Sequence, residues 1–273
     1  DIPHLTSIRG TDLSRGLFHA GRFALVRHTI ESATGITFVN EYLSRLAHLA
    51  FRLPRISEIV PNGVCVSEAP HDHTAVRTSL RTQYAIPGEQ PVLGFVGWAR
   101  PKKGLEDLLD ALAAVERTSP HLLIIGDFLN ARDRGTFVDR ARRLGLTDRV
   151  AVTGPLEHRR VRELLPAVDA VVIPSWDDGM PNVLLEAMER GVAVFGSDVM
   201  ADVLVHGCNG FLFERHDVAE LARLLDRVLW QPDVLAAVGS AARQTVIERF
   251  DYSYERDAYL RIYESLLSAP SAS

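Results

Sequence analysis

The 273-residue sequence is poor in the residues that build disulfide or metal scaffolds. It holds only two cysteines, Cys65 and Cys208, which lie far apart and have no partners at metal-ligand spacing. A reducing cytoplasm is therefore the expected compartment, and both thiols are predicted to be small buried or half-buried groups. We interpret His71-Asp72-His73 as surface residues of a loop, so no metal site is predicted.

Long apolar runs and an excess of basic charge are also absent. No stretch is long enough to span a bilayer, and residues 1–10 lack the basic patch and apolar run of a signal peptide. The net charge of -5 argues against a nucleic-acid partner. Hydrophobic residues make up 47% of the chain, which is sufficient for a sizeable core.

From about residue 90 onward, short apolar runs alternate with segments of helical period. Strands are predicted at 91–97, 121–127, 149–154, 170–175 and 192–198, and helices at 105–115, 137–146, 161–167 and 182–190. Continuous Val, Ile and Phe runs suit strands that are buried on both faces. The alternation predicts a parallel sheet with right-handed crossovers, whose ligands bind at the carboxyl ends of the strands.

The first ninety residues are less regular. Short strands are predicted at 5–8, 36–39 and 58–60, helices at 17–31 and 41–50, a connector at 62–76 and a last amphipathic helix at 254–267. We therefore divide the chain into residues 1–88, 89–249 and 250–273. The helix at 17–31 is only mildly basic, and peripheral contact with a membrane is retained as an alternative.

The segment P-S-W-D-D-G-M-P-N-V-L-L-E-A-M-E-R-G at 174–191 carries the strongest chemical signal. A loop with Asp177 and Asp178 follows a strand, and a helix is expected with Pro181 at its first position. The free N–H groups of a first helical turn favour oxygen-rich ligands. Glu186 suits a vicinal diol, because a carboxylate accepts two hydroxyl hydrogen bonds. In the plainer interpretation, the aspartates only favour the positive helix end and Glu186 is solvated.

A second segment, G-W-A-R-P-K-K-G at 97–104, follows the first strand of the regular region. Its cations Arg100, Lys102 and Lys103 crowd a loop at the ligand end of the sheet, where they are able to neutralise a pyrophosphate. The segment matches neither the G-x-x-x-x-G-K-S/T nor the G-x-G-x-x-G fingerprint. Taken alone, such a short basic run is typical of a solvated loop.

These segments, in this order, resemble the retaining GT-B glycosyltransferases of family 4, and the resemblance covers most of the chain. The best motif is a carboxylate, seven residues, then Glu and Ala, which Asp178 and Glu186 match. Further matches are the G-R-x-x-x-x-K-G frame at 97–104, S-D at 197–198, G-x-x-G at 207–210, the P-N-G-V turn at 61–64 and the final crossing helix at 250–267.

The resemblance implies an α/β fold of GT-B type. Residues 89–249 would form a C-terminal Rossmann-like domain with a parallel sheet that binds the nucleotide sugar. Residues 1–88 would form an incomplete N-terminal Rossmann-like domain with its linker on the acceptor side, and 250–273 a helix that crosses back to it. The implied reaction moves a sugar from a nucleotide-diphosphate donor to an acceptor hydroxyl with retention of anomeric configuration.

Neither a metal nor a cofactor is expected, because Lys and Arg would neutralise the leaving group. The resemblance is compatible with a glycan, a lipid-linked or a small-molecule acceptor. The resemblance also implies a role in cell-envelope polysaccharide biosynthesis. The expected location is the cytoplasm or the inner face of the membrane.

The resemblance also implies residue roles. Lys103 would contact the donor diphosphate, Asp178 the transferred sugar and Glu186 the nucleotide ribose. Arg9 stands where many members have a cleft histidine or arginine, so Arg9, Lys103 and Asp178 are the catalytic candidates. The full donor-binding set is Gly97, Arg100, Lys103, Asp178, Gly179, Met180, Pro181, Asn182 and Glu186. The base is expected against backbone groups at 153–156.

Several positions depart from the family pattern. Trp98 replaces the arginine of the basic loop, Asp178 replaces a glutamate, and Cys65 replaces the aspartate of the interdomain turn. The loop after 197–198 lacks the Gly-Gly pair and has Asp202 at the family's glutamate, and the first domain's upstream strands are expected but not present. The alternatives are a non-catalytic nucleotide-sugar-binding or partner-binding module, and a sugar-nucleotide epimerase of the same fold.

Overall fold

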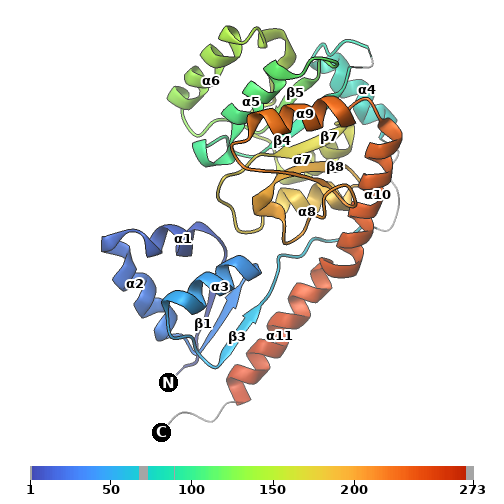
Figure 1. The fold of residues 1–273 in the computed structure, drawn as a ribbon. Helices are drawn as coiled ribbons and strands as arrows, with labels where there is room; N and C mark the ends of the chain where they lie inside the picture. Colours follow the sequence, from blue (N-terminus) through green and yellow to red (C-terminus); the bar gives the residue numbers. More distant parts are fainter. Residues whose placement is uncertain (1, 68–72, 89, 269–273) are drawn as a thin grey trace. The chain divides into compact units, whose positions relative to one another are not determined.

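The computed structural model describes residues 2–67, 73–88 and 90–268 and shows two compact units (Figure 1). The small unit comprises Asp1–Val66, Asp177–Asn182 and Glu248–Ser273, and the large unit comprises Ser67–Trp176 and Val183–Ile247. Within the described ranges no three His, Cys, Asp or Glu side chains form a metal-type group, and no helix suits a bilayer span. His71 and Asp72 lie outside the described residues.

The large unit is built on a six-stranded parallel sheet of order β6-β5-β4-β7-β8-β9. Its strands are β4 (Val92–Val96), β5 (His121–Ile125), β6 (Val150–Val152), β7 (Ala170–Ile173), β8 (Ala193–Ser197) and β9 (Phe211–Phe213). The five predicted strands and the parallel pairing are confirmed. The sequence analysis missed β9, because three residues are too short to show a period.

Alternate strand residues face opposite layers of helices. Leu93 and Phe95 share one core with α5 (Leu105–Ala114), α6 (Ala131–Arg143), α9 (Val218–Val228) and α10 (Pro232–Arg249). Right-handed crossovers that run the other way across the sheet place α7 (His158–Leu164) and α8 (Asn182–Glu189) on the opposite face. The predicted stripe of α5, at Leu105, Leu108, Leu109 and Leu112, is buried as expected.

Helix α6 begins six residues before the predicted start at residue 137. The Asn130 side chain accepts a hydrogen bond from the Asp133 amide at 2.9 Å and caps the helix there. Residues 132–136 are polar or glycine, so the first turn of α6 lacks the apolar stripe from which a helix is predicted. A remaining helix, α4 (Thr74–Gln83), precedes the first strand of the sheet.

The small unit holds three parallel strands in the order β1 (Leu5–Ile8), β2 (Gly35–Phe38) and β3 (Ile56–Ile59). Its helices are α1 (Thr11–Leu17), α2 (Ala20–Glu31), α3 (Glu41–Ala50) and α11 (Tyr252–Ser268), whose Ile262 and Leu266 pack against Val60. The helix predicted at 17–31 is confirmed as α2, which begins three residues later, whereas α1 was missed. The Asp12 carboxylate accepts hydrogen bonds from the amides of Arg9 and Gly10 and so starts a separate helix, α1.

The expectation that both cysteines are buried or half-buried is also wrong, because Cys65 and Cys208 are exposed. Cys208 lies in a tight turn in which the Gly207 amide donates to the Gly210 carbonyl at 2.8 Å. The Asn209 side chain also holds this turn, because its Oδ1 accepts a hydrogen bond from the Val205 amide at 2.7 Å.

Substituting alanine for Gly239 is expected to destabilise the large unit. Glycine-to-alanine changes inside helices usually stabilise by about 0.5–1 kcal/mol. A Cβ at Gly239 in α10, however, would lie 2.0 Å from the carbonyl oxygen of Gly191. We expect Gly239→Ala to lower the unfolding free energy by about 1–3 kcal/mol and Gly135→Ala in α6, where an added Cβ meets nothing within 4 Å, to raise it slightly. Urea unfolding of both variants checks this, and two equal responses would contradict it.

Candidate functional site

The strand order of the large unit reverses between β4 and β7. β4 leads on to β5 and β6 in one direction, whereas β7 leads on to β8 and β9 in the other. In open parallel sheets, ligands bind outside the carboxyl ends of the strands at this switch point. The basic loop at 97–104 follows β4 and residues 174–176 follow β7, so the topology brings these two predicted segments together.

Backbone contacts fix the basic loop against the end of β7. The Trp176 amide donates to the Lys102 carbonyl at 2.8 Å. Gly104 has a left-handed φ of +67°, and a Cβ there would lie 1.9 Å from the Pro174 carbonyl oxygen. Only glycine therefore fits at this position. Of the loop's predicted donor ligands, Lys103 is half-buried and Arg100 is exposed, and Gly97 also has a positive φ.

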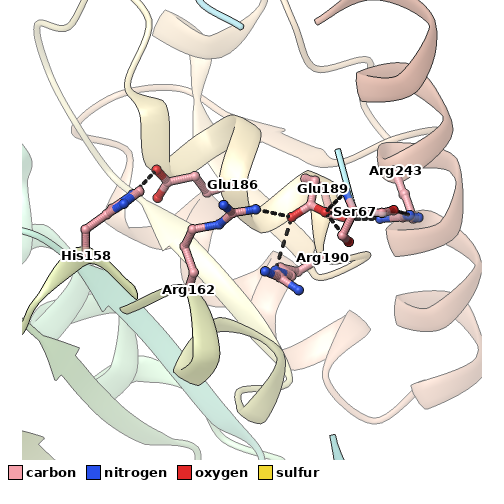
Figure 2. Close-up of polar contacts among 7 residues, drawn as sticks. All are labelled: Ser67, His158, Arg162, Glu186, Glu189, Arg190 and Arg243. Atoms are coloured by element: carbon pink, nitrogen blue, oxygen red, sulfur yellow. Dashed lines mark hydrogen bonds and ion pairs between the residues drawn. The ribbon is translucent and has the colours of Figure 1, made fainter. Parts of the chain in front are cut away.

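Glu186 lies in the second turn of α8 and is only 8% exposed. Its Oε1 is 2.7 Å from Nε2 of His158, which opens α7 and whose side chain is 70% exposed (Figure 2). The interpretation of Glu186 as a solvated carboxylate is therefore wrong. His158 was missed in the sequence analysis, because α7 and α8 become neighbours only through folding.

One turn further along α8, the fully buried Glu189 binds three guanidinium groups (Figure 2). We call Glu189, Ser67, Arg162, Arg190 and Arg243 the Glu189 cluster. The carboxylate accepts hydrogen bonds from the Ser67 amide and hydroxyl at 3.0 and 2.6 Å and lies 3.1–3.4 Å from the three arginines. Burial raises the pKa of Glu189, but the Ser67 hydrogen bonds, the charge of Arg190 and the Arg162 hydrogen bond outweigh it, so the pKa is below its ordinary value.

The Ser197-Asp198 motif links the ends of neighbouring strands. The buried Ser197 hydroxyl donates to the Ser175 carbonyl at 2.6 Å. Asp198 receives hydrogen bonds from Nε and Nη2 of Arg215 at 2.9 and 2.7 Å. Burial raises the pKa of Asp198, but the side-chain and backbone hydrogen bonds of Arg215 hold that pKa below its usual range. Arg215 follows β9, the strand that the sequence analysis missed, and had no signal of its own.

In the small unit, two buried asparagines hold the segment Asp177–Asn182. The Asn40 amide group donates to the Gly179 carbonyl at 2.9 Å. The Asn62 amide group donates to the Met180 carbonyl and to Oδ1 of Asn182, both at 2.8 Å. Asn62 belongs to the P-N-G-V turn, so this turn has a side-chain function that its sequence pattern did not indicate.

Arg9 lies beside the same segment. Its guanidinium donates to Oδ1 of Asn62 and lies 3.7 Å from the Glu255 carboxylate, and its side chain is 48% exposed. A Cβ at Gly179 would lie 2.1 Å from the Arg9 carbonyl oxygen, so a glycine is needed there. The small unit thus gathers Arg9, Asp178, Gly179, Met180, Pro181 and Asn182, and the large unit holds Gly97, Arg100, Lys103 and Glu186.

Comparison with known proteins identifies relatives of this chain. Residues 76–245 match the family glycosyl transferases group 1. The 2-deoxystreptamine glucosyltransferase of Streptomyces kanamyceticus is 29% identical over 89% of this chain and 64% of that protein. The D-inositol 3-phosphate glycosyltransferase of Xylanimonas cellulosilytica is 30% identical over 75% of this chain and 50% of that protein. The chain thus spans about half to two thirds of the length of these relatives.

Solved structures show the fold. Anabaena HepE in complex with UDP and glucose superposes with a TM-score of 0.87 at 21% identity, over 96% of this chain and 72% of that chain. Sucrose-phosphate synthase from Thermosynechococcus elongatus superposes with a TM-score of 0.84 at 20% identity, over 97% and 68%. The fold is the α/β GT-B type with Rossmann-like domains. Since the family match covers more than half of its residues, the chain belongs to the glycosyl transferases group 1.

Proposed function

We propose that the chain is the donor-binding part, with a portion of the acceptor side, of a retaining glycosyltransferase. It would move a hexose from a nucleotide-diphosphate donor to an acceptor hydroxyl. The observation that carries this is the cationic loop at the carboxyl end of β4, fixed by its backbone at the switch point of the sheet. HepE, with which the fold is shared, was solved with UDP-glucose, which supports the same class of donor.

In this proposal the predicted residues keep their roles. Lys103 and Arg100 would bind the diphosphate, Glu186 would accept the ribose hydroxyls, Asp178 would contact the transferred sugar, and Arg9 is the third catalytic candidate. The C1–phosphate oxygen bond breaks, a bond from C1 to the acceptor oxygen forms on the same face, and the acceptor proton passes to the departing diphosphate. Cations around the leaving group stabilise its developing charge, so no metal is required.

The proposed division follows the sequence boundaries, with residues 89–249 on the donor side, 1–88 on the acceptor side and 250–273 as the crossing helix. We place the reaction in the cytoplasm or at the inner face of the membrane, where nucleotide sugars and lipid-linked or glycan acceptors meet. HepE was solved with glucose, and TarM of S. aureus with a glycan and UDP. These complexes support a sugar-based acceptor.

A binding module without turnover is the second candidate, and Trp98 favours it. Its side chain, which is 48% exposed, stands in the basic loop where the family has an arginine. An indole supplies no positive charge to a departing diphosphate, so binding would persist while transfer is lost. Release of nucleoside diphosphate from a donor, abolished in Lys103→Ala, would exclude this candidate.

Calorimetric titration with UDP, GDP and ADP tests the donor site. One of the three is expected to bind, and Glu186→Ala should weaken it at least about tenfold, because a carboxylate bound to a diol contributes charged hydrogen bonds. Glu116→Ala, which removes an exposed carboxylate of the same unit, serves as the matched control and should leave the affinity unchanged. Absence of binding by all three nucleotides at millimolar concentration would overturn the proposal.

A further inference from the structure

Trp176 contacts both the basic loop and the helix that follows it. Its main-chain amide donates to the Lys102 carbonyl at 2.8 Å, and its indole Nε1 donates to Oδ2 of Asp107 at 2.8 Å. Asp107 lies in the first turn of α5, the helix that directly follows the loop. A single residue after β7 therefore bonds the loop through its main chain and, through its side chain, the helix into which the loop leads.

His216 packs against the indole and has a strained main-chain conformation of its own. Its φ is +67°, a left-handed value that glycine adopts most readily. Its Nδ1 lies 3.2 Å from the same Asp107 oxygen, and its ring centroid is 4.4 Å from that of Trp176. Strain of this kind persists only where the surrounding contacts determine it, and it gathers at functional sites.

Arg215 completes the arrangement from the main-chain side. Its Nη1 donates to the Trp176 carbonyl at 2.8 Å, while its Nε and Nη2 bind the Asp198 carboxylate at the end of β8. Trp176 is thus held at its amide, its carbonyl and its ring. We call Trp176, Asp107, Arg215 and His216 the Trp176 network.

We propose that the Trp176 network positions the basic loop for the donor diphosphate, and that its members are positioning residues for Lys103. This inference rests on the proposed function. Lys103 follows Lys102 directly, so fixing the Lys102 carbonyl restricts where the ammonium group can reach. Preorganised charge is the most effective way to stabilise a developing anion, because no reorganisation occurs during the reaction. Asp107, Arg215 and His216 act through Trp176 and need not touch the donor.

The test is a double-mutant cycle on nucleoside diphosphate affinity, with the nucleotide that binds in the calorimetric screen. Trp176→Phe keeps a ring and removes the indole N–H, and it should raise the Kd about tenfold. In a Lys103→Ala background the same change should alter the Kd by less than about twofold, since the group that it positions is gone. Trp230→Phe, at a 53% exposed tryptophan of the same unit, is the control and should have no effect.

His216→Gly separates positioning from stability. Glycine relieves the left-handed strain, so the unfolding midpoint should stay or rise, while the Kd should increase about fivefold because the contact with Trp176 is lost. This variant also keeps the proposal testable if Trp176→Phe fails to fold. Equal losses with and without Lys103, or unchanged affinity in both variants, would overturn the inference.

The outcomes separate this inference from the proposed function. If the wild-type protein binds no nucleoside diphosphate, both are overturned. If the wild-type protein binds the nucleotide, and Lys103→Ala weakens binding while Trp176→Phe does not, the donor site is supported and the positioning role is contradicted.

Discussion

Replacing Glu189 by glutamine is expected to lower the unfolding free energy of the large unit by about 3–5 kcal/mol. The substitution keeps the shape of the side chain but removes the only negative charge that the Glu189 cluster contributes. Three guanidinium groups, on Arg162, Arg190 and Arg243, whose side chains are only 14–26% exposed, would then lie around a buried neutral amide. The cost is large because these like charges repel one another and are only partly solvated.

The control for this prediction is Glu163→Gln in α7. Glu163 is exposed and pairs with the exposed side chains of Arg159 and Arg160. Surface pairs of this kind contribute about 0–1 kcal/mol, so the control should unfold at nearly the wild-type urea concentration. If Glu189→Gln and Glu163→Gln give the same midpoint, the buried cluster does not stabilise the unit.

The pH dependence of stability should follow from the same carboxylate. Because the pKa of Glu189 is lower in the folded protein than in the unfolded chain, the group binds fewer protons when folded. Its contribution is therefore present above the unfolded pKa, at about pH 4.3, and is lost as pH falls through the folded pKa. Urea unfolding as a function of pH should show that the unfolding free energy falls less steeply with decreasing pH in Glu189→Gln than in the wild-type protein.

Replacing Lys103 by alanine is expected to reduce kcat/KM for a nucleotide sugar by about 10²–10³. In the proposed reaction the charge on the departing diphosphate develops where the basic loop is fixed by the Lys102 and Gly104 contacts. Loss of the ammonium group removes an interaction that strengthens in the transition state, so kcat should fall more than donor affinity. Steady-state release of nucleoside diphosphate measures this.

Arg132→Ala provides the matched control for Lys103→Ala. Arg132 is an exposed cation of the same unit, at the start of α6, and its removal should leave kcat/KM within about twofold of the wild-type value, since exposed charges are largely screened. A comparable loss in both variants would point to a general effect of net charge and would contradict the assignment of Lys103.

Local pattern determined the sheet and the loops beside it. The runs at 91–97 and 170–175 are continuous apolar segments bounded by polar residues, and both became the strands expected of them, β4 and β7. Strand alternation with helices implied a parallel sheet, and a parallel sheet implied that the basic loop lies at a ligand-binding edge. Each of these inferences depends on neighbours within a few residues.

The hydrophobic pattern did not predict helix starts that depend on a side-chain cap, nor a very short strand. Helix α1 begins where the Asp12 carboxylate accepts hydrogen bonds from two backbone amides. Helix α6 begins directly after its Asn130 cap, six residues before the first apolar residue of the predicted helix. Strand β9 is three residues long, which is shorter than any period that a pattern can show. Capping and strand pairing depend on single contacts, so the hydrophobic period does not report them.

The sequence by itself determined the family, the parallel sheet and the positions of Lys103 and Glu186 on a loop and a helix that flank its carboxyl edge. Only the tertiary structure decided their partners. His158 meets Glu186 across 28 residues, Arg243 meets Glu189 across 54, and Asn62 meets Met180 across 118. A periodic pattern records which face of an element is apolar, whereas a polar contact depends on the packing that brings side chains of two distant elements within hydrogen-bonding distance.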